Sequence, residues 1–194
     1  SPWPTRSDLW TGHPGNARRL TSDGRLGEPD AREDGAIVAV QGAPGTNRLV
    51  RVTMDGVITP LTRIHPDTQW AEPRWSPRGD RISAVRWTHG GFGDIVVLDT
   101  LGAFVARVTS DRAVDASPSW SRDGRWLFFS SDRTGVTQLY AVPVDSLGAD
   151  DGINGALVRR LSSASTGLFE PELSPNGAQL AAMHYRDDGF HVGV

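Results

Sequence analysis

The stretch SPSWSRDGRWLFFSSDRTGVTQLYAV (117–142) decides the fold, because its pattern recurs along the chain. It opens with a Pro six residues before a Gly, and an apolar run follows. A turn with Asp and Gly then leads into a second apolar run. The dipeptide Asp123-Gly124 is a strong signal for a tight hairpin. The stretch therefore predicts short antiparallel β-strands joined by tight turns.

The opening motif of this stretch occurs four times. Its copies are EPDAREDG (28–35), EPRWSPRG (72–79), SPSWSRDG (117–124) and EPELSPNG (170–177). The successive motif prolines lie 44, 45 and 53 residues apart. Repeats of about 40–45 residues are typical of β-propeller blades, each a four-stranded sheet.

The apolar runs after each motif have the character of buried strands. AIVAV (36–40), RISAV (81–85) and WLFFS (126–130) show little alternation of apolar and polar residues. Strands covered on both faces lack that alternation, and neighbouring blades would supply the cover. The last strand of each unit is polar, as Arg159 and Arg160 indicate. No segment keeps a helical period, so we predict almost no helix.

These observations predict an all-β chain, a β-propeller of four-stranded antiparallel blades, with residues 1–194 as one propeller segment. About four blades are present, three complete and two partial. The expected blades are 1–22 (partial), 29–62, 73–110, 118–162 and 171–194 (partial). The longest repeat holds a polar insertion at 146–156, expected to be a surface loop. The two partial blades could combine to close a four-bladed ring, but we favour a piece of a larger ring.

Composition excludes several classes of function. The formal net charge is −3, and all 20 basic residues are Arg and are scattered, so we expect no nucleic-acid binding. The chain has no Cys, which excludes disulfides and thiolate chemistry. No stretch approaches the roughly 20 apolar residues of a membrane helix, so no membrane insertion by this chain is expected.

Motifs for catalysis or cofactor binding are missing from the sequence. There is no Gly-x-Ser-x-Gly elbow of a serine hydrolase and no HExxH zinc motif, and a phosphate loop would need Lys. His184 and His191 could meet across a hairpin, but we expect ordinary surface residues. Asp150, Asp151 and Asn154 lack the full calcium-loop pattern. We predict no catalytic residue, no cofactor and no metal.

The tryptophans fall into two groups. Trp75 and Trp120 occupy the same position of the repeat, which predicts packing between blades. Trp70 and Trp87 lie outside that position and are the better candidates for exposed contacts with a partner.

Three glutamates also recur, at one position of the motif. Glu28, Glu72 and Glu170 each precede the motif Pro, and Ser117 stands there in the other copy. Recurrence indicates a structural role rather than catalysis. It would also place a ring of carboxylates near one mouth of the central channel, as a surface for a cation or for an Arg of a partner.

The motifs quoted above resemble the WD40-like repeat of TolB-type periplasmic propellers and of the propeller in prolyl-oligopeptidase-like enzymes. The residues that carry the resemblance are SPSWSRDGRWLFFSSDRTGVTQLYAV (117–142) and EPRWSPRGDRISAV (72–85). The resemblance covers nearly the whole chain. It implies a non-enzymatic scaffold that binds a protein or peptide partner in the periplasm or outside the cell.

Two other functions stay open. The chain could be the accessory propeller of a larger enzyme such as a serine peptidase, or the soluble domain of an outer-membrane or transport protein. Further blades would then come from the rest of the protein or from another subunit.

Overall fold

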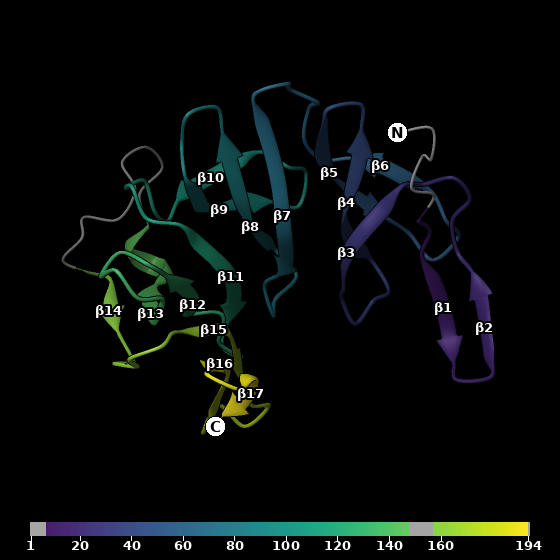
Figure 1. Ribbon diagram of the computed structural model, residues 1–194. Helices are drawn as coiled ribbons and strands as arrows, with labels where there is room; N and C mark the ends of the chain where they lie inside the picture. Colours follow the sequence, from purple (N-terminus) through teal and green to yellow (C-terminus); the bar gives the residue numbers. More distant parts are fainter. Residues whose placement is uncertain (1–6, 148–156, 194) are drawn as a thin grey trace.

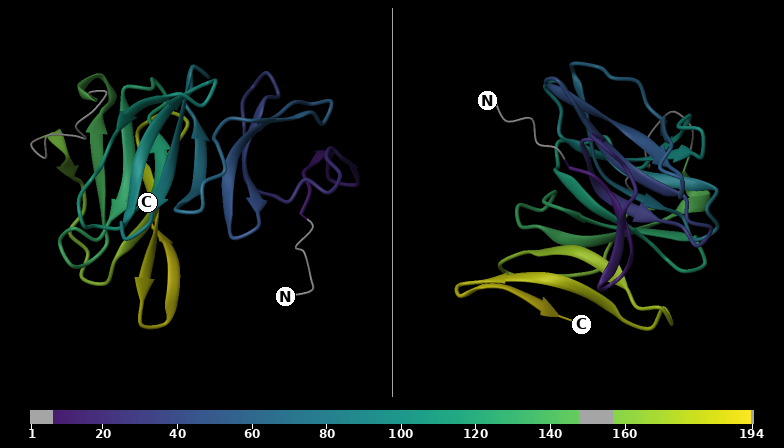
Figure 2. Two further views of the ribbon diagram at one scale, coloured as in Figure 1. Left: turned by 90° about the horizontal axis from the view of Figure 1, so that it is seen from above. Right: turned by 90° about the vertical axis from the view of Figure 1, so that its right-hand side faces the viewer.

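The computed structural model describes residues 7–147 and 157–193 as a curved row of antiparallel sheets (Figures 1 and 2). Three sheets have four strands each, and a two-stranded and a three-stranded sheet flank them. Within each four-stranded sheet the strands follow one another in chain order. This is the predicted arrangement of propeller blades, and it confirms the all-β fold.

The three complete sheets are named here the first, second and third blade. The first blade contains β3 (Leu26–Ala31), β4 (Ile37–Ala43), β5 (Thr46–Val52) and β6 (Ile58–Pro60). The second contains β7 (Thr68–Trp75), β8 (Arg81–Thr88), β9 (Gly93–Asp99) and β10 (Phe104–Arg107). The third contains β11 (Asp115–Trp120), β12 (Trp126–Ser131), β13 (Gln138–Pro143) and β14 (Arg159–Arg160).

The flanking sheets are partial blades. The one near the N-terminus contains β1 (Trp10–His13) and β2 (Asn16–Arg19), and the last contains β15 (Leu168–Leu173), β16 (Leu180–Arg186) and β17 (Gly189–Gly193). A repeated hydrogen bond identifies β1 and β2 as third and fourth strands. The Thr21 hydroxyl accepts the Leu9 N–H (3.0 Å), as the Thr109 hydroxyl accepts the Ile95 N–H (2.9 Å) in the second blade.

The two partial sheets stay separate. They lie at opposite ends of the row (Figure 1) and share no strand pairing. The chain as described therefore forms an open arc rather than a closed four-bladed ring. Of the loop expected at 146–156, Ser146 belongs to a short helical turn, and residues 148–156, with Asp150, Asp151 and Asn154, lie outside the described residues.

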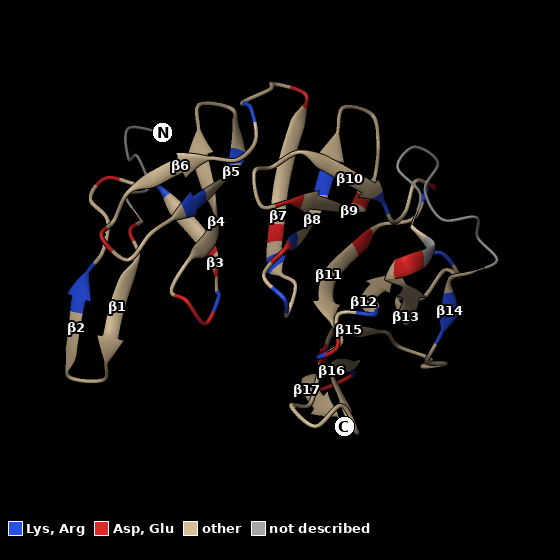
Figure 3. Cartoon of the chain, turned by 180° about the vertical axis from the view of Figure 1, so that it is seen from behind, with Lys and Arg blue, Asp and Glu red and all other residues tan. Residues whose placement is uncertain are grey.

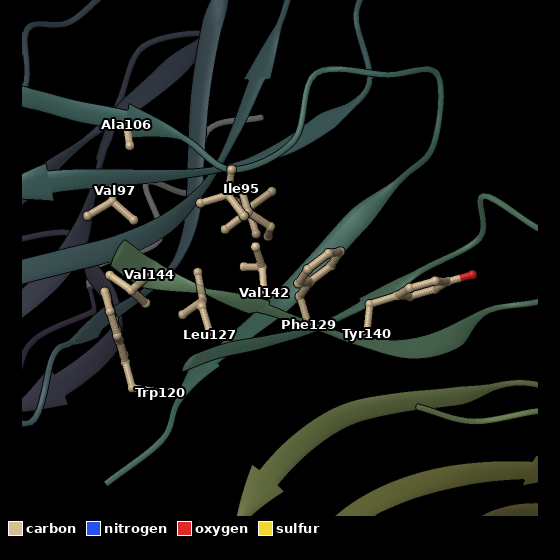
Figure 4. Close-up of a cluster of buried hydrophobic side chains, with 11 residues drawn as sticks. Ile95, Val97, Ala106, Trp120, Leu127, Phe129, Tyr140, Val142 and Val144 are labelled. Atoms are coloured by element: carbon tan, nitrogen blue, oxygen red, sulfur yellow. The ribbon is translucent and has the colours of Figure 1, made fainter. Parts of the chain in front are cut away.

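The hydrophobic core lies between consecutive blades. Figure 4 shows one cluster, in which Ile95 and Val97 of the second blade face Leu127 and Phe129 of the third. A second cluster joins the first and second blades. Trp75 and Trp120 are 7% and 9% exposed, so the packing predicted from their repeat position is confirmed. Burial on both faces explains why the middle strands show no alternation.

The outer edge of the row is polar. Every residue of β2 and β14 is exposed, and their arginines colour these strands blue in Figure 3. Helical geometry in the described residues is limited to a 3-10 turn at Val144–Ser146 and to the single residue Leu157. None of the described segments is a helix long and apolar enough to cross a membrane.

Candidate binding channel

The first strand of each blade after β2 carries a bulge at the same place. The strand register shifts between Gly27 and Asp30 in β3, and the same shift recurs in β7, β11 and β15. The residue before the motif Pro has a positive φ in all four copies. These residues are Glu28 (51°), Glu72 (51°), Ser117 (55°) and Glu170 (52°). A non-glycine residue there costs about 1–2 kcal/mol, so a compensating interaction is expected.

The compensation is a hydrogen bond between neighbouring blades. The Glu28 carboxylate accepts the backbone N–H of Glu72 at 2.5 Å, and the Glu72 carboxylate accepts that of Ser117 at 2.5 Å. The bulge frees these N–H groups from the ladder of their own blade. A charged acceptor makes such a bond stronger than one between neutral groups. Two of the three recurrent glutamates thus join one blade to the next.

A second set of polar contacts lies one residue beyond the Pro. The Asp30 carboxylate accepts the backbone N–H of Trp75 (2.7 Å), and the Ser119 hydroxyl donates to Glu172 (3.3 Å). Burial raises the pKa of Asp30, and the Trp75 N–H acts in the opposite direction. Each contact crosses from one blade to the next, so the first strands are held together by polar bonds as well as by the core.

The four first strands surround one cavity of about 490 Å³. Its carboxylates are Glu28, Glu72, Glu170 and Glu172, and the one cation among its described lining residues is Arg74. The predicted carboxylate positions do converge, at bulges inside the inner strands. The Glu170 carboxylate forms no hydrogen bond or ion pair with any described residue. The cavity therefore offers acceptors for a cationic or hydrogen-bond-donating group.

The two candidate tryptophans lie elsewhere. Trp70 is only 8% exposed, because its face of β7 packs against the first blade; the expectation of an exposed side chain is corrected here. Trp87 is 37% exposed and pairs across the sheet with Gly93. Neither residue lines the channel cavity.

The two histidines lie opposite each other across a hairpin, as expected, but they form no part of a metal site among the described residues. His184 and His191 are directly opposed on β16 and β17. The His184 ring bonds Thr166 (3.0 Å), and the His191 ring bonds Asp188 (2.7 Å). Across residues 7–147 and 157–193, no group of three or more His, Asp or Glu side chains is placed to hold a metal ion.

Three polar residues that line the cavity were not identified from the sequence: Arg74, Ser119 and Glu172. They share one position, directly after the motif Pro, where side chains of different types stand in the four copies. Aligning the four repeats could have identified this position. It lies on the innermost strand beside the recurrent Glu and Pro, and residues there contact the neighbouring blade.

Comparison with known proteins places the chain. The family model described as the TolB beta propeller domain matches residues 64–194, more than half of the chain. An uncharacterized protein of Agrobacterium fabrum is 31% identical over 116 residues, which is 60% of this chain and 36% of that protein.

Two solved structures share the fold. TolB from Acinetobacter baumannii superposes with a TM-score of 0.74 at 21% identity, over 92% of this chain and 43% of TolB. A puromycin-hydrolyzing peptidase of Mycobacterium tuberculosis gives a TM-score of 0.70 at 21% identity, over 97% of this chain and 32% of the peptidase. The chain spans less than half the length of these three relatives. With the repeat, the blades and the family match taken together, the chain belongs to the TolB beta propeller domain family.

Proposed function

We propose that this chain is a non-enzymatic propeller segment that binds a protein or peptide partner through its central channel. The observation that carries the proposal is the carboxylate-lined cavity formed by the four first strands. Four carboxylates face one guanidinium there, so the cavity favours a partner segment that carries Arg, Lys or a free amino terminus. Family membership supports a binding rather than a catalytic role, although a propeller fold alone does not decide function.

The glutamates have different parts in this proposal. Glu28 accepts a hydrogen bond from the next blade with one carboxylate oxygen, and Glu72 accepts with both, from the N–H and the hydroxyl of Ser117, so these two residues hold the cavity wall in shape. Glu170 has no such partner among the described residues, and its carboxylate is available to a ligand. Glu172 accepts only the weak 3.3 Å bond from Ser119. We therefore expect Glu170 and Glu172 to contribute most to binding.

A titration with model peptides tests the proposal. A fluorescent Arg-rich decapeptide should bind, and a Glu-rich peptide of equal length should not. Glu170→Gln or Glu172→Gln should each weaken binding by about fivefold, the scale of one solvated ion pair. The matched control is Glu33→Gln, an exposed glutamate outside the cavity. Equal binding of both peptides, or unchanged affinity in both channel variants, would contradict the proposal.

The proposed setting is the periplasm or another extracytoplasmic space, as the resemblance to TolB-type propellers implies. The likeness to the peptidase propeller supports a second candidate, in which the chain is the accessory propeller of a larger enzyme. A domain with a nucleophile elbow in the remainder of the protein, together with peptide hydrolysis by the full-length protein, would favour that alternative. Peptide binding in the channel without hydrolysis would favour the scaffold.

A further inference from the structure

A second pocket lies on the seam between the first and second blades, away from the channel. Its volume is about 460 Å³, and it shares no lining residue with the channel cavity. Leu61 of the first blade's last segment forms part of one wall, and Leu98 and Phe104 of the second blade form another. Both blades are complete, so the pocket does not depend on the open ends of the arc. A cavity of this size suits a small ligand.

The polar groups of the pocket are predominantly hydrogen-bond donors. Trp70, Arg86 and Arg63 line it, and none of its described lining residues is Asp or Glu. The indole Nε1 of Trp70 and the Nε of Arg86 are buried and have no hydrogen-bond partner. The Arg86 guanidinium lies 6.0 Å from the centre of the Trp70 ring. Buried donors without an acceptor are costly, so an acceptor that reached them would bind favourably.

The corresponding place in the first blade is closed. The strand registers make Gln41 of β4 the counterpart of Arg86 of β8. Gln41 donates to the carbonyl of Gly24, in the segment that enters its blade (3.0 Å), and accepts from Arg48 (2.9 Å). In the second blade, the segment before β7 contains Arg63, and Arg86 forms no hydrogen bond or ion pair with that segment. The unpaired donors of the second blade therefore have no equivalent at this place in the first blade.

One carboxylate lies near enough to compete. Asp94 stands opposite Arg86 on β9, but the two form no ion pair within 4.0 Å. Burial has the largest effect on Asp94 and raises its pKa to about 6, although the charges of Arg107 and, to a smaller extent, Arg86 act in the opposite direction. One Asp94 oxygen is itself buried without a partner. Arg86 thus forms no close ion pair with a described acidic residue, and its guanidinium can still pair with a carboxylate from outside.

We propose that this pocket binds a carboxylate attached to an apolar group. The carboxylate would accept hydrogen bonds from Arg86, Arg63 and the Trp70 indole, and the apolar group would lie against Leu61, Leu98 and Phe104. Arginine suits the site, because its planar guanidinium pairs with both oxygens of a carboxylate. The chemistry is that of a peptide carboxyl terminus with an apolar last residue, or of a free aromatic acid.

NMR of the tryptophan indole N–H signals tests this directly, because the chain has seven tryptophans and Trp70→Phe identifies one signal. Three probes separate the contributions: N-acetyl-phenylalanine, its neutral amide, and 4-phenylbutyrate. The Trp70 signal should shift saturably with N-acetyl-phenylalanine, with a dissociation constant on the order of 1 mM for a ligand of this size. If 4-phenylbutyrate also binds, the pocket accepts any acid with an apolar group. If only N-acetyl-phenylalanine binds, the pocket recognises a peptide carboxyl terminus.

Charge-removing variants complete the test. Arg86→Met and Arg63→Met keep the apolar stem and should weaken binding about tenfold or more. Arg78→Met, in the turn between β7 and β8, is the matched control and should leave affinity unchanged. Unshifted signals of the other tryptophans show that each variant is folded. A Trp70 signal that does not move, equal binding of the amide, or full affinity in both Met variants would overturn the proposal.

Discussion

Removing the Glu72 carboxylate should loosen the junction between the second and third blades. In Glu72→Ala the backbone N–H of Ser117 loses its acceptor, while the N–H of residue 72 can still bond Glu28. A hydrogen bond to a charged acceptor contributes about 1.5–3 kcal/mol. We therefore expect Glu72→Ala to lower the free energy of unfolding by about 2 kcal/mol, or the melting temperature by about 4–8 °C.

The positive φ at this position separates the hydrogen bond from backbone strain. Alanine keeps the strain of the 51° conformation, whereas glycine relieves about 1 kcal/mol of it. Glu72→Gly should therefore be about 1 kcal/mol more stable than Glu72→Ala. Glu72→Gln keeps a neutral acceptor and should lose about 1 kcal/mol relative to the unaltered protein.

Urea and thermal unfolding, followed by circular dichroism, measure these differences. Glu33→Ala is the control, because Glu33 is exposed in the turn before β4, and it should stay within about 0.5 kcal/mol. Two results would refute the reasoning. One is a Glu72→Ala protein as stable as its parent, and the other is a Glu72→Gly protein less stable than Glu72→Ala.

Three further substitutions test other parts of the account, each by thermal unfolding. Gly102→Ala should lower the free energy of unfolding by about 2 kcal/mol or more, because the new Cβ would lie 2.0 Å from a carbonyl oxygen of the preceding blade. The Cβ of Gly45→Ala would meet open space, so this substitution should cost only about 1 kcal/mol. Arg133→Met removes the cation that contacts the fully buried Asp115 carboxylate at 3.0 Å, and should lower the free energy of unfolding by about 3 kcal/mol at pH 7. Unchanged stability would contradict this pairing. Burial raises the pKa of Asp94 to about 6, above its unfolded value, so the ionised form destabilises the folded state above that pH. Asp94→Asn should therefore stabilise at pH 7.5, by about 1 kcal/mol for a half-exposed group, and the gain should shrink as the pH falls toward 4.

Most of the fold followed from local chemistry repeated along the chain. The Pro-to-Gly motif and the apolar runs locate the strands to within a few residues, as RISAV (81–85) inside β8 illustrates. Trp75 and Trp120 were predictable core residues, because equivalent positions in stacked blades face equivalent neighbours. Repetition turns a weak local signal into a strong one, since four copies must satisfy the same geometry.

The details of the candidate site depended on contacts between blades and were less predictable. The local sequence does not predict the positive φ of Glu72, because a residue before Pro in a strand is normally extended. Its partner N–H lies 45 residues away, on Ser117. Trp70 was expected at the surface because it falls outside the motif, but the neighbouring blade covers it. Periodicity within one strand carries no information about such cover.

Hydrogen–deuterium exchange of the protein with and without the Arg-rich decapeptide tests the channel most directly. The account predicts slower exchange confined to the first strands, β3, β7, β11 and β15, around the bulges that carry the carboxylates. The Glu170→Gln, Glu172→Gln double variant should lose most of that protection at the same peptide concentration. Protection on the outer strands β6 and β10 instead, or none on the first strands at saturating peptide, would contradict binding in the channel.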